Sequence, residues 1–285
     1  VINGESVYSE EVVWFPKTQS DPSYHFDGIV SAMKTAASKM PRVDAIGVSS
    51  AGVYINNHTM SASLFLKVSP EDYEKYVKDI YIRAAKEIGD VPLTVCNDGD
   101  VTALAGAMSL GEDGILGIAM GTSEAGGYVD MKGNITGWLN ELAFVPCDLA
   151  PDAMVDEWSG DIGCGVKYFS QDAVIKLDPA LSPAEKLKVV QGKMEQGDAG
   201  ARAIYETIGV YLGYTLAFYA MFYEINHVLL MGRVTSGEGG DLVLAKAQEV
   251  LRTEYPQLKM QVNLPDEKSR RVGQSVAAAS LPQIG

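Results

Sequence analysis

The 285-residue chain is poor in positive charge. It has 23 lysines and arginines against 37 aspartates and glutamates, which gives a formal net charge of −14. Proteins that bind nucleic acid without sequence preference, or that dock on anionic membrane surfaces, need lysine and arginine to neutralise phosphate groups. The composition argues against both classes, so we expect no contact with nucleic acid or membrane.

Cysteine and histidine are scarce, with three of each. The cysteines are odd in number and far apart: Cys96, Cys147 and Cys164. This usage is typical of a reducing compartment and not of a disulfide framework. The histidines are scattered as well: His25, His58 and His227. Because no set of histidines and cysteines has the spacing of zinc ligands, we predict no structural zinc site.

Long apolar runs are also missing. The longest uncharged one, residues 207–223, has 17 residues, contains four tyrosines and is bounded by Glu206 and Glu224. A membrane-spanning helix needs about 20 apolar residues, so a buried core helix is the better interpretation. The first fifteen residues contain acids and no basic leader, which argues against a signal peptide. Together with the cysteine usage, this predicts a cytoplasmic protein.

Apolar periodicity predicts alternating strands and helices in the first part of the chain. Strands are expected at residues 7–15, 43–49 and 91–96, and helices at 26–40 and 70–88, the second with Ser69 as N-cap. Such alternation is typical of helices packed on a largely parallel sheet.

The remainder of the chain continues as mixed α/β. We expect a helix at 98–110, strands at 114–120 and 126–131 that form a hairpin around the glycine-rich stretch 121–127, and an irregular segment at 138–170. Helices dominate about 184–225, and the chain ends with a strand (227–231), a helix (about 240–254), a strand (258–264) and a helix (268–281). The fold class predicted is α/β with two lobes. One lobe is expected to comprise residues 1–95 completed by about 265–285, and the larger one residues 96–264.

Asp98 follows the expected buried strand at 91–96 directly after Asn97. In open α/β sheets ligands collect outside the carboxyl ends of the strands. A carboxylate there is well placed to accept a proton from a substrate hydroxyl. The alternative is that Asp98 is only the N-cap of the following helix, a position that aspartate and asparagine favour. The two roles do not exclude each other.

Two glycine-rich turns follow apolar strands. Gly121, Thr122 and Ser123 could turn backbone N–H groups and a hydroxyl towards phosphate, although a tight hairpin explains them nearly as well. The second turn, residues 232–240, would allow close approach of a nucleotide, and an ordinary strand-to-helix turn is the alternative. Neither turn matches a Walker loop or a dinucleotide-binding fingerprint.

Taken in order, these segments resemble the ROK family (repressors, open reading frames and sugar kinases) of the actin/hexokinase-like superfamily. Asn97-Asp98 resembles the family's sugar and catalytic motif, and Gly121-Thr122-Ser123 with Gly126-Gly127 its second phosphate loop. The stretch 49–52, Ser-Ser-Ala-Gly, resembles the substrate loop, and 140–144, Asn-Glu-Leu-Ala-Phe, stands where the family has Glu-Ile-Gly-His. The resemblance covers nearly the whole chain and depends on the order and spacing of the motifs.

The resemblance implies an actin-like/ribonuclease H-like ATPase fold with a central cleft, and an ATP- and Mg²⁺-dependent sugar kinase. Asp98 would be the general base. The implied substrate-binding residues are Ser50, Gly52, Asn97, Asp98 and Glu141. The implied phosphate and nucleotide contacts are Gly121, Thr122, Ser123, Gly232, Arg233 and Gly239, with Mg²⁺ held by the phosphates. A homodimer is expected by analogy only.

The chain departs from the family pattern at several positions. Phe144 stands in place of the family's zinc-binding histidine, only Cys164 matches its cysteine cluster, and Val166 replaces a second sugar-binding glutamate. The substrate is therefore not necessarily glucose. Asp156, Trp158 and Asp161 could form a different pocket wall, or a plain surface loop. The family's first phosphate loop is expected to precede Val1, so we also expect that the N-terminal segment is missing here.

Two other functions remain open. The first is a sugar-sensing module with weak or no catalysis, either a ROK-like regulator, which in that family carries an N-terminal DNA-binding region, or a non-catalytic binding module. The other possibility is another ATPase of the same superfamily. The presence of Asp98 together with a sugar-type Glu141 counts mildly against it.

Overall fold

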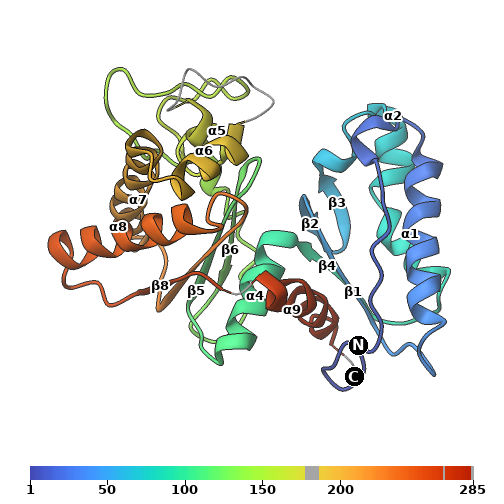
Figure 1. Cartoon of the computed structure of the whole chain (residues 1–285). Helices are drawn as coiled ribbons and strands as arrows, with labels where there is room; N and C mark the ends of the chain where they lie inside the picture. The colour runs from blue at the N-terminus through green and yellow to red at the C-terminus, as the bar shows by residue number, and fades with distance from the viewer. Residues whose placement is uncertain (177–185, 266, 284–285) are drawn as a thin grey trace. The chain divides into compact units, whose positions relative to one another are not determined.

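The computed structural model describes residues 1–176, 186–265 and 267–283 (Figure 1). Contacts divide the chain into two compact units: unit 1, residues Val1–Ala105 with Lys268–Gly285, and unit 2, residues Gly106–Glu267. Both units combine helices and strands, which confirms the α/β class expected from the sequence.

Unit 1 contains two pairs of short strands. The first pair is parallel, β1 (Ile46–Ser50) with β4 (Leu93–Asn97), and the second is antiparallel, β2 (Val53–Ile55) with β3 (His58–Ser61). The helices of unit 1 are α1 (Pro22–Ala37), α2 (Pro70–Asp72), α3 (Ile80–Lys86), the first part of α4 (Asp98–Leu110) and nearly all of α9 (Glu267–Ser280).

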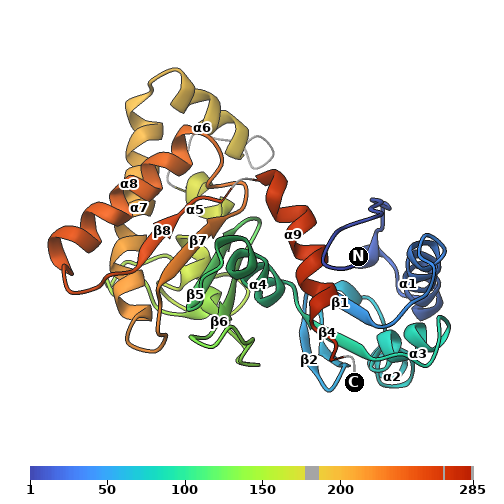
Figure 2. The same ribbon diagram turned by 90° about the horizontal axis from the view of Figure 1, so that it is seen from below.

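Side chains of β1 alternate between two packing surfaces, as the period of a strand requires. Val48 packs with Val95 and Ile80 in a core to which α1 also contributes. On the opposite side, Gly47 lies so close to Ala278 of α9 that a Cβ would come within 1.8 Å of its carbonyl oxygen. Helices α1 and α3 therefore cover one face of the parallel pair and α9 the other (Figure 2).

The expected strand at 7–15 is not formed. Its apolar side chains are between 50% and 78% exposed: Val7, Val12, Val13 and Phe15. No strand in the described part of the chain pairs with this backbone. Without a ladder partner, an extended segment gains neither inter-strand hydrogen bonds nor a sheet face to bury.

The expected helix at 70–88 is formed but interrupted. Ser69 caps it as predicted, accepting a hydrogen bond from the Asp72 N–H at 3.1 Å. A π-helical turn, Tyr73–Val77, then separates α2 from α3, with the Lys78 N–H donating to the Tyr73 carbonyl. The wider turn leaves both Val77 and Ile80 fully buried.

Unit 2 is built on a four-stranded sheet in the order β6-β5-β7-β8. Its strands are β5 (Ile115–Met120), β6 (Glu124–Val129), β7 (His227–Met231) and β8 (Gln261–Asn263). β5, β7 and β8 are parallel, and β6 is antiparallel to β5, which confirms the expected hairpin. The helices are α5 (Gln171–Lys176), α6 (Lys186–Glu195), α7 (Ala199–Tyr219), α8 (Glu238–Glu254) and the end of α4.

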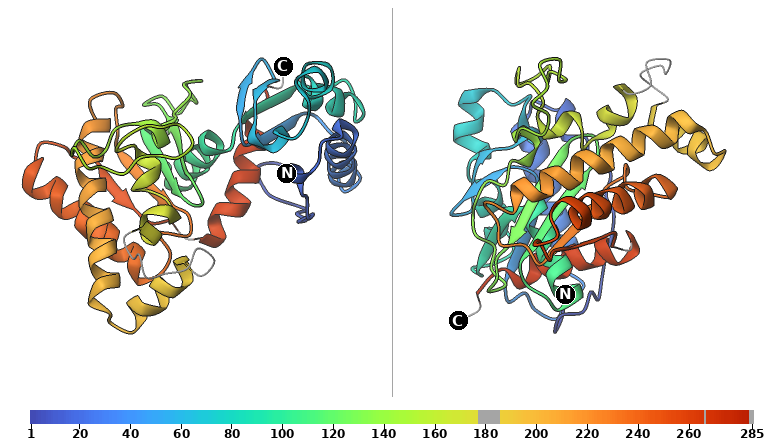
Figure 3. Two further views of the ribbon diagram at one scale, coloured as in Figure 1. Left: turned by 90° about the horizontal axis from the view of Figure 1, so that it is seen from above. Right: turned by 90° about the vertical axis from the view of Figure 1, so that its left-hand side faces the viewer.

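Helices α7 and α8 lie side by side over one face of this sheet (Figures 1 and 3). Val228 and Leu230 of β7 share a core with apolar side chains of α7. Leu229 points to the other face, where Gly106 of α4 allows its close approach. The apolar run at 207–223 is thus mainly a packed helix, and no helix among the described residues is long and apolar enough to cross a membrane.

The contact boundary between the units falls inside α4, at 105/106, whereas the sequence suggested 95/96. The first part of α4 belongs with unit 1 because Val101 and Ala105 pack on Ala277 and Ala278 of α9. These are small side chains far apart in the sequence, and their pairing is a tertiary contact.

Candidate active site

Asn97, the last residue of β4, fixes the start of α4. Its Oδ1 accepts a hydrogen bond from the Gly99 N–H at 2.8 Å, and its Nδ2 donates to the Gly52 carbonyl at 2.9 Å. Asn97 therefore occupies the N-cap position of α4, and the Asp98 Oδ1 accepts the same Gly99 N–H at 3.1 Å. The Asp98 carboxyl lies on the first helical residue, at the carboxyl end of a parallel strand.

The environment of Asp98 makes it a stronger base than an ordinary aspartate. Burial raises its pKa above the usual value, while hydrogen bonds from the backbone N–H groups of Asp98 and Gly99 oppose this shift. The carboxyl remains partly accessible. Because basicity rises with pKa, burial here favours proton abstraction.

The stretch 49–52 lies beside Asn97, as the resemblance requires. Ser50 of β1 is in register with Asn97 of β4. Its hydroxyl is buried and already engaged by two tyrosines, accepting from Tyr54 at 2.8 Å and lying 2.7 Å from the Tyr81 Oη. The structure thus gives Ser50 a role in tying β1 to α3, and its contact with a substrate stays a prediction.

The two glycine-rich turns of unit 2 meet at one edge of the sheet. They follow β5 and β7, which are parallel neighbours, so their carboxyl ends lie together. The Val234 N–H donates to the Met120 carbonyl at 3.2 Å. Gly232 packs against the same residue with φ +99°, and a Cβ there would come within 2.3 Å of the Met120 oxygen. Gly232 and Arg233 are thus brought beside Gly121, Thr122 and Ser123.

The loop after β5 is shorter than the sequence suggested. Only Gly121, Thr122 and Ser123 lie outside the strands, and the Gly121 N–H donates to the Ser123 carbonyl at 2.9 Å. The side chains of Thr122 and Ser123 are exposed. Gly126 belongs to β6, and a Cβ there would come within 2.6 Å of both the Asn140 carbonyl oxygen and the Leu142 side chain.

The glycines at the start of α8 have a packing reason of their own. Gly239 lies against the Tyr205 ring, where a Cβ would come within 2.5 Å of a ring carbon. The ordinary strand-to-helix turn therefore accounts for Gly239 without a ligand. The helix N-terminus nevertheless lies at the sheet edge that bears the two loops, and Arg233 is exposed there.

Glu141 is in unit 2, immediately before a short 3-10 turn, Leu142–Phe144. It is an exposed residue whose pKa is raised by partial burial of the carboxyl. The predicted site residues therefore form two sets. Ser50, Gly52, Asn97 and Asp98 lie together in unit 1, and the phosphate and nucleotide residues lie together in unit 2.

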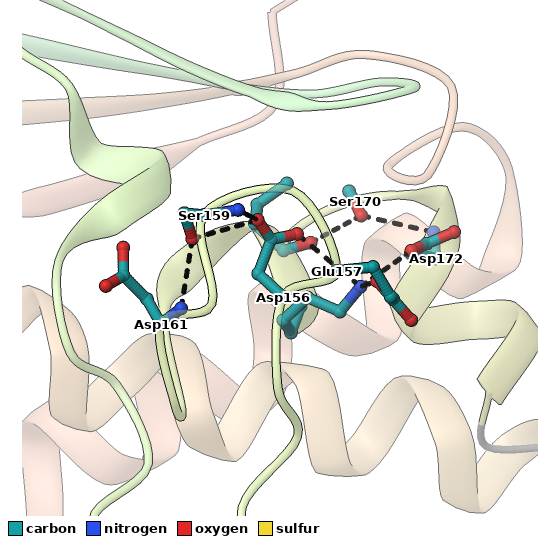
Figure 4. Close-up of polar contacts among 8 residues, drawn as sticks. Asp156, Glu157, Ser159, Asp161, Ser170 and Asp172 are labelled. Carbon is teal, nitrogen blue, oxygen red and sulfur yellow. Dashed lines mark hydrogen bonds and ion pairs between the residues drawn. The ribbon is translucent and has the colours of Figure 1, made fainter.

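Asp156 is a structural residue of a surface loop (Figure 4). Its Oδ2 accepts hydrogen bonds from the Ser159 N–H at 2.8 Å and the Ser159 hydroxyl at 3.0 Å. Trp158 is 84% exposed, and Asp161 is exposed as well. The arrangement favours the surface loop over the pocket wall.

A buried ammonium group holds this loop to α5. Lys167 is 1% exposed, and its Nζ lies 2.7 Å from Glu157, 2.9 Å from Asp172 and 3.7 Å from Asp156. A buried lysine is tolerated only when it is paired in this way. The cluster stabilises the irregular segment that carries Glu141, since the turn at Gly165–Lys167 packs on Leu142–Phe144.

Two buried charged residues were missed in the sequence. Lys167 stands two residues beyond Cys164-Gly165, in a segment without periodicity. Glu124 begins β6 and is 5% exposed, with no hydrogen-bond partner among the described residues for either carboxylate oxygen. Burial raises its pKa to about 8. The sequence signal that could have indicated Glu124 is a single acidic residue at the start of a strand whose other residues are small or apolar.

No group of three or more histidine, cysteine, aspartate or glutamate side chains in the described ranges is arranged to hold a metal ion. Two shallow hollows lie on unit 2, one between α8 and β8 and one between α7 and α8. Neither is lined by a residue predicted for the site.

No protein-family model matches the chain, and no curated protein matches its sequence significantly. Solved structures do match. A ROK hexokinase from Thermus thermophilus is 19% identical with a TM-score of 0.72, and the match covers 96% of this chain and 91% of that one. A ROK-family glucokinase from Streptomyces griseus, in complex with glucose and AMPPNP, is 20% identical with a TM-score of 0.65 over 91% and 88% of the two chains.

A regulator has the same fold. A ROK-family transcriptional regulator, a homologue of the E. coli MLC protein, is 16% identical with a TM-score of 0.63. That match covers 90% of this chain and 68% of the regulator. At these identities the likeness establishes the fold and not the activity. The chain therefore has the fold of the ROK hexokinases, the actin-like ATPase fold that its motifs predicted.

Proposed function

We propose that the protein is an ATP-dependent kinase that phosphorylates a hydroxyl group of a sugar or sugar derivative. The observation that carries the proposal is the arrangement of the Asn97 and Asp98 side chains at the end of β4. Asn97 occupies the N-cap position of α4 and accepts the Gly99 N–H at 2.8 Å, and the Asp98 Oδ1 shares this donor at 3.1 Å, which fixes the Asp98 carboxyl at the start of the helix. A partly buried, basic carboxylate at the carboxyl end of a parallel strand suits a general base.

In this mechanism Asp98 accepts the proton of the substrate hydroxyl as the oxygen attacks the γ-phosphorus of ATP. Asn97 and Gly52 define the substrate loop beside it, and Glu141 holds a further hydroxyl. A carboxylate that accepts a hydroxyl proton while the phosphoryl group moves is the arrangement used by kinases in general. Support also comes from the fold shared with a hexokinase and with a glucokinase bound to glucose and AMPPNP.

The nucleotide phosphates would be held by the loop Gly121–Ser123 and by Gly232–Arg233. Exposed hydroxyls on Thr122 and Ser123 and the nearby N-terminus of α8 fit an anionic group. Mg²⁺ would neutralise the phosphate charge when bound with the nucleotide. The residues of the chain contribute binding and orientation.

The proposal is tested by ADP release from ATP and Mg²⁺ over a panel of sugars. Sugar-dependent turnover is expected, and Asp98→Asn should lower kcat about 100- to 10,000-fold, because removal of a general base has effects of this size. Asp90→Asn is the matched control, an exposed aspartate of the same unit that should leave kcat unchanged. Equal turnover by the parent and Asp98→Asn would reject the assignment.

A sugar-sensing regulator is the second candidate, favoured by the match to the ROK-family regulator. Phe144 at the position of the family's zinc-binding histidine and Val166 at the position of a sugar-binding glutamate also fit altered or lost catalysis. Sugar binding measured by calorimetry, with no ADP release for any sugar, would support this function over the kinase.

A further inference from the structure

Glu124 is an acid without a visible partner, buried in the protein interior. It is 5% exposed, and neither of its carboxylate oxygens has a hydrogen-bond partner among the described residues. The carboxyl lies against the main chain of Gly165, where a Cβ would come within 2.3 Å of Oε2. An unpaired buried carboxylate is among the most costly groups a fold can contain, so its presence calls for a physical explanation.

Two titratable groups lie near Glu124. The Cys147 thiol and the Tyr219 hydroxyl are near enough for the Glu124 carboxyl to raise the pKa of each. The Thr215 hydroxyl lies beside the Cys147 thiol, and the buried Tyr219 hydroxyl has no partner among the described residues. Burial raises the pKa of Cys147 to about 12 and that of Tyr219 well above its usual value, so both stay neutral where Glu124 titrates.

Glu124 is also the residue on which the loop Gly121–Ser123 ends. It pairs with Met120 across the β5–β6 hairpin, so these two residues form the base of the three-residue loop. The Ser123 hydroxyl lies 3.4 Å from the Glu124 carbonyl oxygen. A displacement of Glu124 therefore displaces the loop directly.

We propose that Glu124 is a positioning residue, whose neutral carboxyl keeps the loop Gly121–Ser123 in its binding geometry and whose ionisation releases the loop. The proposal deepens the function proposed above, since it assigns a control of phosphate binding to that loop. Glu124 itself touches no substrate in this scheme. It acts through the hairpin that carries Thr122 and Ser123.

The direction of the effect follows from burial. With the pKa raised to about 8, the carboxyl is protonated and neutral in the folded protein below that pH. As the pH rises through 8, the folded state must either accept an uncompensated buried charge or expose the carboxyl to water. Exposure requires movement at the base of the hairpin. Because the exposed carboxyl has its ordinary pKa of 4.5, opening of the loop becomes steadily more favourable from about pH 4.5 to pH 8 and levels off above pH 8.

Hydrogen exchange of the peptide spanning residues 120–127 tests this without any ligand. The parent is compared with Glu124→Gln and Glu124→Leu at pH 4.5 and at pH 9, so that the effect of pH on intrinsic exchange cancels. At pH 9 the difference between the exposed and buried pKa values favours opening of the parent, which should exchange faster than either variant by up to about 1,000-fold. At pH 4.5 the three should agree within about twofold. Either variant suffices if the other folds poorly.

Glu254→Gln serves as the control, an exposed acid at the end of α8 whose exchange in this peptide should equal that of the parent at both pH values. Equal exchange of the parent and both Glu124 variants at pH 9 would overturn the proposal.

Calorimetric binding of Mg²⁺-ATP over the same pH range separates this inference from the kinase proposal. An affinity that falls between pH 4.5 and pH 8 in the parent, beyond the change seen for Glu124→Gln, supports both the nucleotide site and the positioning role. Exchange that depends on Glu124, together with no nucleotide binding at any pH, would reject the nucleotide site and keep the positioning role. Nucleotide binding with identical pH profiles in parent and variant would reject the positioning role alone.

Discussion

At the scale of single residues, Asn97 and Asp98 show how neighbouring side chains divide two tasks. Asn97 uses both ends of its amide, one on the helix start at Gly99 and the other on the loop carbonyl of Gly52. Asp98 is thereby left as a partly buried carboxylate on a fixed backbone. The sequence offered both roles for Asp98, and only the geometry shows that its neighbour is the cap.

Asn97→Ala should lower the free energy of unfolding by about 1–2 kcal/mol, because α4 loses its N-cap and the Gly52 carbonyl loses a donor. Urea unfolding at neutral pH measures this. Asn97→Asp keeps the capping oxygen and should recover most of the loss. A cost below about 0.5 kcal/mol for Asn97→Ala would show that the cap contributes little.

At the scale of elements, apolar periodicity was sufficient to predict the helices and strands whose apolar side chains pack regularly along the element. Helix α4 and strand β7 have the predicted limits, and α7 forms where the long apolar run lies. The prediction of a strand at 7–15 was wrong, because a strand forms only beside a neighbouring strand, and composition does not reveal whether that neighbour exists. The β2–β3 hairpin was missed, although its turn residues Asn56 and Asn57, with φ of 51° and 66°, are a typical hairpin signal.

The irregular segment 138–170 is held by isolated bridges, Pro146 with Cys164 and Val155 with Ile162, and by the buried ion pairs of Lys167. Lys167→Met should lower the free energy of unfolding by about 2 kcal/mol, less than the 3–5 kcal/mol typical of a broken buried ion pair. The reduction is expected because Glu157 and Asp172 are 69% and 43% exposed, so only Asp156 is left as a buried charge.

Thermal or urea unfolding measures this change. Lys78→Met is the control, since its pair with Glu74 is at the surface and should contribute less than about 1 kcal/mol. Equal effects of the two substitutions would show that the Lys167 cluster does not stabilise the segment.

At the scale of the whole molecule, the predicted ligand contacts are divided between the two units. The substrate loop and Asp98 belong to unit 1, and both glycine-rich loops belong to unit 2. Mg²⁺-ATP should therefore slow hydrogen exchange in peptides covering 120–123 and 232–240, and a bound sugar in peptides covering 50–52 and 97–99. Peptides of α1 serve as the internal reference. Protection by nucleotide confined to unit 1 would contradict the assignment of the two loops.

The sequence by itself determined the α/β class, most of the helices and strands and, through the order of its motifs, the actin-like fold. It could do so because periodicity, capping residues and turn residues act over a few neighbouring positions. Tertiary structure decided which residues meet: Asn97 with Gly52, Lys167 with its three acids, Gly232 with Met120, and Glu124 in an interior without a countercharge. The contacts of Asn97 and Gly232 join segments that are distant in the chain, and the energies of all these contacts depend on burial, which no local pattern specifies.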